Sequence, residues 1–393
     1  MFPTQFTGAS FTWERKKLGD VAEKVIQKNN NNAFKNVLTN SAEYGIISQR
    51  DFFERNIANK NNISTYYIVQ NDDFVYNPRI SNLAPYGPIN RNKTGYTGII
   101  SPLYYVFRVL NINTAFIEWY FKTTCWHKFM YQHGDSGARS DRFSIKDNEL
   151  KKLPIKLPAD DMEQEKIAKT LTSLDNTLQL HEDHLQFLHS SKSFLLQKMF
   201  FDNDIPPLLR FNKFTEKWNQ CKLNDHTIVT MGQSPNSKNY TNNQTGKILV
   251  QGNADLYKNK ILKRVFTTEV TKTAVKNDIL ISVRAPVGDI ARNQYESVVI
   301  GRGIASIKGN DFLYYQLEKM KNNGFWNKYI AGSTFESITG KDLKNTKIYT
   351  TNSDEERKIG NIFSSLTKII QLQEHKIDSL KKLKQFLLQN MFI

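Results

Sequence analysis

Cysteine is scarce in this sequence, with Cys125 and Cys221 the only two among 393 residues. Two thiols cannot build a disulfide framework, and no Cys/His spacing suits a structural zinc ion, so both are expected to be ordinary buried thiols. No stretch approaches 18 consecutive apolar residues, and residues 1–13 lack a basic segment followed by an apolar run. Membrane insertion and secretion are therefore not indicated, and the expected location is the cytoplasm.

The sequence also lacks the short motifs that mark common catalytic sites. No Gly-x-x-x-x-Gly-Lys-Ser/Thr phosphate loop occurs, so the chain is not expected to hydrolyse ATP itself. Gly301-Arg302-Gly303 lacks the third glycine of a dinucleotide-binding loop, and Asn77-Pro78-Arg79 lacks the second proline and the aromatic residue of an amino-methyltransferase loop. Seven scattered histidines and the two cysteines form no nucleophile–base set. No catalytic residue and no metal ligand is assigned.

Positive charge, in contrast, is plentiful. Lysine and arginine number 54 against 38 acidic residues, which gives a formal net charge of +16. With 39% hydrophobic residues the chain can bury sizeable cores, and its length allows two or three domains. A basic globular protein of this kind favours a polyanionic partner, and nucleic acid is the leading candidate.

Two stretches of the chain occur twice. The residues around Trp13 recur around Trp218, 205 positions later. Lys166–Phe201 recurs as Lys358–Ile393, displaced by 192 positions, with 15 identities over 36 positions. Because the first stretch opens each half and the second closes it, the sequence predicts one ancestral unit that was duplicated.

The repeats divide the chain into four predicted segments. They are a first variable region (1–155), a central repeat helix (156–204), a second variable region (205–348) and a C-terminal repeat helix (349–393). The positive excess lies mainly in the two variable regions, whereas residues 151–205 carry more acidic than basic residues. A polyanion is therefore expected on the variable regions.

Both copies of the closing repeat read as long helices with a heptad seam. Apolar residues recur at alternating spacings of four and three, which is typical of a coiled coil. The seam comprises Ile167, Leu171, Leu174, Leu178, Leu185, Leu188, Leu195 and Met199 in the first copy, and Ile359, Phe363, Leu366, Ile370, Ile377, Leu380, Leu387 and Met391 in the second. Capping boxes are predicted at Asp161 with Gln164 and at Ser353 with Glu356.

The two apolar stripes are expected to cover each other in an antiparallel pair. Each buried seam residue contributes roughly 1.5 to 3 kcal/mol, and a partner within the same chain is available at high effective concentration. Such a pair would relate the two variable regions by a pseudo-two-fold axis, at opposite ends of the helices. The alternative is a structural strut or a homodimerisation device. Duplicated basic regions favour instead a reader of two separated sites on a duplex.

The variable regions mix strand and helix signals, so the predicted fold class is mixed α/β (α+β). Expected strands include 65–69, 74–76, 247–251, 278–284 and 297–300, and expected helices include 114–127 and 312–322. Loops after the strands concentrate arginine and lysine, whose side chains suit guanine edges and phosphates. The candidate DNA-binding residues of this kind are Arg79, Arg91, Lys93, Arg139, Arg142, Arg284, Arg292 and Arg302, with the hydroxyls of Ser333 and Thr334 as phosphate donors.

At this point the chain resembles the specificity subunit of type I restriction-modification systems over nearly its whole length. Thr230–Pro235, Val250–Asp255 and Asn277–Gly288 look like the second target-recognition domain of that family, and Phe74–Arg79 looks like the matching stretch of the first. Glu163-Gln-Glu-Lys-Ile167 and Glu356-Arg-Lys-Ile359 open the two long helices, and Leu-Leu-Gln-x-Met-Phe ends both. Ser234, Gln251 and Asn253 lie within these motifs and join the candidate DNA-binding residues, as does Lys238.

The resemblance implies a DNA reader that is not itself an enzyme. Each recognition domain would bind half of a split target in double-stranded DNA, and the helix pair would fix the spacing. No cofactor is expected in this chain; S-adenosylmethionine, ATP and Mg²⁺ are expected on two DNA methyltransferase subunits and two restriction and translocation subunits of a prokaryotic complex. Two alternatives are a self-contained DNA methyltransferase or nuclease with unrecognised motifs, and a basic coiled-coil protein that binds DNA without sequence preference.

Overall fold

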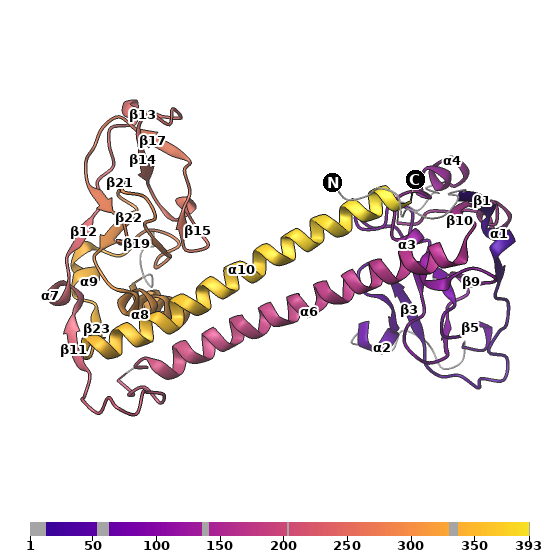
Figure 1. Cartoon of the computed structure of the whole chain (residues 1–393), viewed down its shortest axis with the longest axis horizontal. Coiled ribbons are helices and arrows are strands. Elements are labelled where there is room, and N and C mark those ends of the chain that lie inside the picture. Colours follow the sequence, from indigo (N-terminus) through magenta and orange to yellow (C-terminus); the bar gives the residue numbers. More distant parts are fainter. Residues whose placement is uncertain (1–12, 53–62, 136–140, 203, 330–336, 393) are drawn as a thin grey trace. The chain divides into compact units, whose positions relative to one another are not determined.

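The computed structural model describes residues 13–52, 63–135, 141–202, 204–329 and 337–392 (Figure 1). Its contacts divide the chain into two compact units. Unit 1 combines Met1–His181 with Lys376–Ile393, and unit 2 is the stretch Glu182–His375. Each unit therefore contains one variable region together with part of each long helix.

Unit 1 contains a globular part, here called the first head (residues 13–158). Its elements are β1 Trp13–Lys17, α1 Leu18–Val21, β2 Ala22–Lys24, β3 Leu38–Ser41, β4 Gly45–Ser48, α2 Gln49–Phe52, β5 Tyr67–Val69, β6 Phe74–Tyr76, β7 Ile89–Arg91, β8 Gly98–Ile100, β9 Tyr105–Val109, α3 Thr114–Phe121, α4 His127–His133, α5 Asp147–Leu150 and β10 Pro154–Pro158. Four of the strands form an antiparallel sheet in the order β2-β9-β6-β7. Phe74 lies opposite Phe107 in this sheet, and their rings stack with centroids 5.3 Å apart.

Unit 2 contains the corresponding second head (residues 219–350). Its elements are β11 Asn219–Lys222, α7 Leu223–His226, β12 Val229–Met231, β13 Tyr240–Thr241, β14 Lys247–Val250, β15 Leu256–Tyr257, β16 Lys260–Ile261, β17 Val265–Thr267, β18 Thr273–Val275, β19 Ile279–Ser282, β20 Ile290–Arg292, β21 Ser297–Ile300, β22 Ile304–Ile307, α8 Asp311–Asn322, α9 Gly340–Lys344 and β23 Lys347–Thr350. One sheet runs β12-β22-β19-β20, and a second runs β13-β17-β14-β21-β18.

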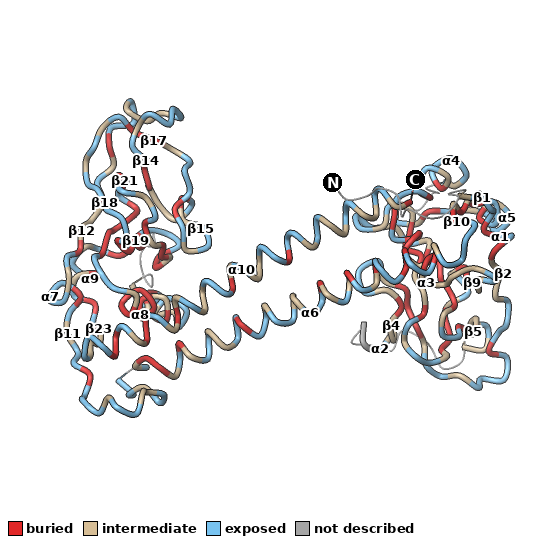
Figure 2. The backbone as a smooth tube through the Cα atoms, viewed as in Figure 1, coloured by how far each residue is buried: buried red, intermediate tan, exposed pale blue. Residues whose placement is uncertain are grey.

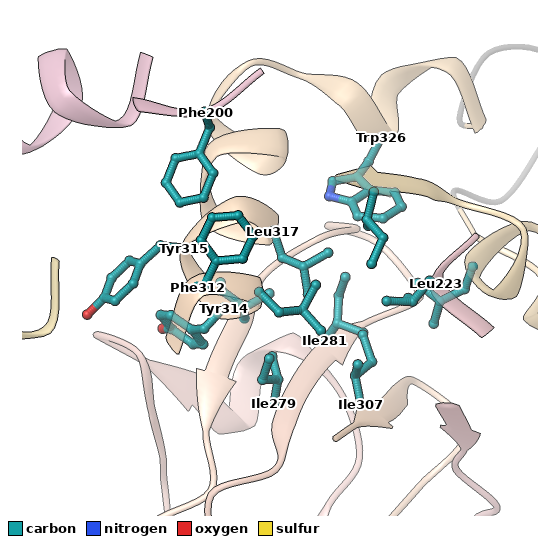
Figure 3. Close-up of a cluster of buried hydrophobic side chains, with 14 of the residues drawn as sticks. Phe200, Leu223, Ile279, Ile281, Ile307, Phe312, Tyr314, Tyr315, Leu317 and Trp326 are labelled. Carbon is teal, nitrogen blue, oxygen red and sulfur yellow. The ribbon is translucent and has the colours of Figure 1, made fainter. Parts of the chain in front are cut away.

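The two heads repeat the same core sheet. In both, the strand that follows the first short helix (β2 or β12) pairs with the strand that precedes the longer helix of the head (β9 before α3, β22 before α8). That strand pairs with β6 or β19, which in turn pairs with β7 or β20. In the second head, Ile279 and Ile281 of β19 and Ile307 of β22 face Phe312 and Leu317 of α8 across a buried cluster (Figure 3). The predicted mixed α/β class with two repeated domains is confirmed, and the repeat extends into the variable regions, where sequence identity had not revealed it.

A tryptophan at the start of each head marks the repeat at atomic detail. Trp13 donates its indole N–H to Glu163 Oε1 at 3.3 Å, and Trp218 donates to Glu355 Oε2 at 3.1 Å. The tryptophans lie beside equivalent small sheets, β1-β10 and β11-β23, in which the opening and closing strands of a head pair antiparallel. Each bond therefore ties the opening of a head to the first turn of the long helix that follows it.

The long helices are α6, Asp161–Met199, and α10, Ser353–Met391, each 39 residues. Their caps lie one residue earlier than predicted. Asp160 Oδ1 accepts from the Met162 N–H, and Asn352 Oδ1 accepts from the Asp354 N–H, both at 2.9 Å. The predicted capping boxes at Asp161 and Ser353 are wrong, because these two residues are already the first residues of the helices. The N-cap is the residue just before the helix, and its side chain accepts the N–H of the second helical residue.

The glutamine and glutamate expected in those capping boxes fasten the heads instead. Gln164 is buried and accepts from the Asn113 N–H at 3.1 Å, while Glu356 Oε2 accepts from Asn310 Nδ2 at 2.7 Å. Asn113 and Asn310 are the N-caps of α3 and α8, each accepting a backbone N–H of its own helix. The N-terminus of α3 and that of α8 are therefore each fastened to the first turn of a long helix, by a backbone N–H in the first head and by a side-chain amide in the second.

Within each unit the two long helices meet by opposite ends. In unit 1, Ile167 and Leu171 near the start of α6 share a core with Leu387 and Met391 at the end of α10. In unit 2, Leu196 and Met199 at the end of α6 share a core with Ile359 and Phe363 at the start of α10. The pairing is therefore antiparallel in both units, as the seam predicted.

Aromatic residues at the helix ends complete the two head cores. Phe200 follows α6 and packs on Trp218, Phe312 and Phe363. Phe392 follows α10 and packs on Trp13, Phe116 and Tyr120. Both side chains are buried. The chain thus inserts the end of one long helix into the head that precedes the other.

The two cysteines are not buried as expected. Cys125 is exposed, and its Sγ–H donates to the Phe392 carbonyl at 3.1 Å, whereas Cys221 on β11 is half-buried. The expectation fails because Cys125 lies in the connection between α3 and α4, and Cys221 lies in the two-stranded sheet β11-β23. Burial raises the pKa of the Cys221 thiol.

The predicted seam positions vary in depth, as the alternation of colours along both helices illustrates (Figure 2). Ile167, Leu171, Leu174, Leu178 and Leu188 of α6 and Ile359, Phe363, Ile370 and Ile377 of α10 are buried, and Leu185, Leu366 and Leu380 are half-buried. A charged contact joins the stripes in unit 1, where Lys384 donates to Asp175.

Candidate nucleic-acid interface

Arg79 and Arg142 lie opposite each other in the first head. They form an isolated antiparallel bridge just after β6, flanked by the Phe143 N–H donating to the Pro78 carbonyl at 2.8 Å and the Ile80 N–H donating to Asp141 at 3.1 Å. Arg79 is exposed and Arg142 is half-buried. Neither forms an ion pair with any residue that the structure describes.

The backbone that presents Arg79 is held by a buried asparagine. Asn77 Oδ1 accepts from the Arg79 N–H at 3.0 Å, while Asn77 Nδ2 donates to the Asn40 carbonyl at 2.8 Å. Pro78 removes one backbone donor and fixes its own φ. The stretch Asn77-Pro78-Arg79 is therefore a rigid turn that carries a guanidinium at its tip.

Three loops meet at the end of the core sheet in the second head. The Arg302 N–H donates to Ser234 Oγ at 3.1 Å, and the Gly303 N–H donates to the Gln251 carbonyl at 3.1 Å. A Cβ at Gly303 would lie 2.3 Å from that carbonyl, so only glycine permits the approach. The predicted residues Ser234, Gln251 and Arg302 are thus brought together from three separate parts of the sequence.

Arg284 lies beside this loop cluster. The Val283 N–H donates to the Gly303 carbonyl and the Ile338 N–H donates to the Val283 carbonyl, both at 2.9 Å. Arg284 itself is exposed and lies opposite Ser337 in an isolated antiparallel bridge. Asn253 belongs to the same surface, because Asp255 Oδ2 accepts the Gln251 N–H at 2.8 Å and so folds the stretch 251–255 into a tight turn.

Lys238 lies on the same connection between β12 and β13 as Ser234. It is exposed on a short 3₁₀ helix, Ser237–Asn239. Glu269 accepts from the Asn236 N–H at 2.8 Å and from Asn239, and these two bonds lower the pKa of Glu269. The two hydrogen bonds to this carboxylate hold the loop 236–239 against Glu269.

Three of the predicted DNA-binding residues, Arg91, Lys93 and Arg292, form ion pairs with acidic side chains of their own heads. Arg91 contacts Asp72 at 2.6 Å and Glu118 at 3.2 Å. Lys93 contacts the same Glu118 at 3.1 Å. These contacts hold β7 against α3 and leave both cations less available to an external anion than Arg79.

Arg292 has the same internal role in the second head. It ion-pairs with Asp311 at the start of α8 and donates to the carbonyls of Asn277 and Gly309 at 2.8 and 2.9 Å. Its guanidinium also lies 4.9 Å from the centre of the Tyr314 ring. Arg292 thus joins β20 to α8. The remaining candidates, Arg139, Ser333 and Thr334, lie outside the described residues.

The part of the chain that the structure describes holds no group of three or more histidine, cysteine, aspartate or glutamate side chains arranged for a metal ion. Among the same residues, no helix has the length and apolar character needed to cross a membrane.

The protein family described as "Type I restriction modification DNA specificity domain" matches the chain twice, over residues 11–189 and 215–382. The chain belongs to this family. The two matches coincide with the two copies of the internal repeat, since each contains one head and most of the long helix that follows it.

Individual relatives agree with the family. A protein of Methanocaldococcus jannaschii, named as the specificity subunit of the type I restriction enzyme MjaX, is 31% identical over 258 residues, covering 62% of this chain and 59% of that protein. A second, named as the MjaIX specificity subunit of the same organism, is 27% identical over 126 residues, covering 30% of this chain and 28% of that protein. The chain thus matches less than two thirds of the length of these curated relatives.

Solved structures share the fold of this specificity-domain protein. The S subunit of a type I restriction-modification system from M. genitalium superimposes with a TM-score of 0.61 at 15% identity, covering 100% of this chain and 99% of that one. The HsdS subunit from Thermoanaerobacter tengcongensis gives a TM-score of 0.50 at 21% identity, covering 97% and 96%.

Sequence reasoning missed two residues of this specificity-domain surface. Ser337 lies opposite Arg284, 53 positions later in the chain, and no local pattern announces that pairing. Arg264 is exposed and donates to the Ala254 carbonyl at 2.9 Å, beside the turn that carries Asn253. The adjacent pair Lys263-Arg264 between two strands was a signal of the same kind as those used for the other arginines.

Proposed function

We propose that this chain is the DNA sequence-specificity subunit of a type I restriction-modification complex. Each head would bind one half of a bipartite target in double-stranded DNA. The observation that carries the proposal is the duplicated head. Each copy presents an exposed arginine, Arg79 in one and Arg284 in the other, and neither has an ion-pair partner among the described residues. Two similar basic surfaces in one chain suit two separated segments of one polyanion.

In this proposal the chain directs chemistry that other subunits perform. Two DNA methyltransferase subunits would carry S-adenosylmethionine, and two restriction and translocation subunits would use ATP and Mg²⁺. The four segments predicted from the sequence, 1–155, 156–204, 205–348 and 349–393, would act as two recognition modules and two helices that set the distance between the recognised half-sites.

The proposal is tested by sequencing methylated adenines in a cell that expresses the methyltransferase subunits with or without this chain. We expect one split motif, with two defined halves and an undefined gap, only when the chain is present. A purified chain that methylates or cleaves DNA without other subunits would contradict the proposal and favour a self-contained enzyme.

A binding experiment separates sequence reading from non-specific attraction. Competition between the identified duplex and a scrambled duplex is measured at several salt concentrations. Specific binding should exceed non-specific binding by at least about 10³-fold, whereas contacts to phosphate alone lose affinity with salt and show no preference. Equal competition by both duplexes would show that the chain binds DNA without selecting sequence.

A further inference from the structure

The arginine bridges of the two heads occupy the same place in the repeat. Arg79 and Arg284 are 205 positions apart, the displacement that also relates Trp13 to Trp218. Each arginine follows the second strand of its core sheet in chain order, β6 or β19, and each lies in an antiparallel bridge to a residue that precedes the final short helix of the head.

The hydrogen bonds around the two bridges match as well. The residue before each arginine accepts a backbone N–H from the residue after its bridge partner, Pro78 from Phe143 at 2.8 Å and Val283 from Ile338 at 2.9 Å. In the first head a second bond, from the Ile80 N–H to the Asp141 carbonyl at 3.1 Å, completes the pattern of a non-hydrogen-bonded pair between widely spaced hydrogen bonds. The side chains of Arg79 and Arg142 therefore lie on one face at the closest spacing that a sheet offers.

Arg79 and Arg142 are consequently two like charges placed side by side. Like charges directly opposite each other on a sheet repel, and no described acidic side chain forms an ion pair with either one. An anion lying between the two guanidinium groups would remove that repulsion and accept charge-assisted hydrogen bonds from both. In the second head the partner of Arg284 is the exposed hydroxyl of Ser337, which is a neutral donor.

Equivalence between the heads decides which part of DNA these arginines meet. The loops that surround them differ in sequence and in length, as loops that read different bases must. Because both heads carry an arginine at the same position, we expect it to contact the part of DNA that is the same in both half-sites. That part is the phosphate backbone.

We propose that Arg79 and Arg284 are equivalent phosphate-binding residues that position the two heads on DNA without reading bases, with Arg142 as a second cation in the first head. This inference rests on the proposed function and adds the class of contact that each arginine makes.

The test uses the full chain assembled with its methyltransferase subunits, and measures affinity for the identified duplex against salt. Arg79→Ala and Arg284→Ala should each weaken binding about ten- to hundredfold at low salt. Each should lower the slope of log affinity against log salt by about 0.9, while the preferred sequence stays unchanged. Arg15→Ala and Arg357→Ala, which remove exposed arginines from β1 and from the start of α10, are matched controls that should leave the slope unchanged.

A gain-of-charge variant separates loss of a DNA contact from loss of folding. Ser337→Arg builds the arginine pair of the first head into the second, and should tighten binding to all sequences and raise the slope by about 0.9. If the wild-type protein selects a sequence but Arg79→Ala and Arg284→Ala alter the preferred bases, this inference alone is overturned. The same holds if these variants leave the slope of log affinity against log salt unchanged. A wild-type protein without sequence preference would instead overturn the proposed function.

Discussion

Glu355 is the most heavily bonded carboxylate at the junction between a head and a long helix. It is fully buried and accepts from Arg210 at 2.9 and 2.8 Å, from the Trp218 indole at 3.1 Å and from Thr351 at 2.6 Å. Burial by itself raises the pKa of this carboxyl, but the hydrogen bonds from Arg210 and Thr351 outweigh it, and the pKa of Glu355 is lowered.

This carboxylate gives a prediction with a defined pH dependence. Because its pKa is lower in the folded state, Glu355 stabilises the fold fully above its unfolded pKa of about 4.3, and that contribution is lost as pH falls through the folded value. Glu355→Gln should cost about 2 to 3 kcal/mol at pH 7 in urea unfolding followed by tryptophan fluorescence. The difference in the free energy of unfolding between the variant and the wild type should shrink as pH falls from about 5 to about 3, because Glu355 becomes protonated in the wild type.

The internal repeat supplies the control for this experiment. Glu163 occupies the equivalent position in unit 1, but among the described residues it accepts a single, longer hydrogen bond, from Trp13 at 3.3 Å, and it is only half-buried. Glu163→Gln should therefore cost less than about 1 kcal/mol. Equal losses from the two variants would contradict the view that the Arg210 contact stabilises the second head.

Residue type in the sequence identified possible DNA contacts but not their partners. Arg79 follows β6 and Arg91 ends β7, yet only Arg91 meets acidic partners, Asp72 and Glu118, which lie 19 and 27 positions away along the chain. Only the fold brings such residues together. Sequence reasoning therefore could not separate an arginine that holds β7 to α3 from one that remains available to DNA.

The long helices were the elements that the sequence predicted best, because a seven-residue apolar pattern repeated over many turns is a strong signal. Their N-terminal caps were misplaced by one residue, since Asp160 and Asp161 are chemically alike, as are Asn352 and Ser353 in capping ability. The choice depends on backbone dihedral angles that a sequence pattern does not specify.

The corrected caps are tested by alanine substitution. Asn352→Ala removes the acceptor of the Asp354 N–H and should cost about 1 kcal/mol of stability, whereas Ser353→Ala, one residue inside the helix, should change it by less than about 0.5 kcal/mol. Thermal unfolding of the two variants makes the comparison. A larger loss from Ser353→Ala would restore the capping box that the sequence predicted.

The end of α10 makes a second prediction at the scale of an element. Phe392 is buried among Trp13, Phe116 and Tyr120, so Phe392→Ala should cost about 3 to 5 kcal/mol in chemical unfolding of unit 1. Phe386→Ala is the matched control, because that side chain on the same helix is 45% exposed and its loss should cost less than about 1 kcal/mol. Similar effects of both variants would show that the helix end does not anchor the head.

At the scale of the whole molecule, the duplication is deeper in structure than in sequence. The sequence revealed it only at Trp13 and Trp218 and along the long helices, where packing against a constant partner restricts substitution. The core strands are three to five residues long and pair with partners far along the chain, so their order leaves no local pattern. The Trp–Glu bonds span 150 positions in the first head and 137 in the second, and this difference in length also hides the alignment of the heads.

The proposed role of the helices in setting the gap between half-sites leads to a last prediction. The seam repeats every seven residues, so removing one heptad from each helix, 179–185 and 371–377, preserves its phase, whereas removing four residues from each rotates the apolar positions away from one another. Seven residues correspond to about 10 Å of helix, or about three base pairs of DNA. Methylation-site sequencing should therefore show the same two half-sites with a gap about three base pairs shorter for the heptad deletion. The four-residue deletion should disturb assembly or abolish methylation. An unchanged gap in an active heptad-deletion protein would contradict the role of the helices as spacers, while leaving the assignment of the two heads intact.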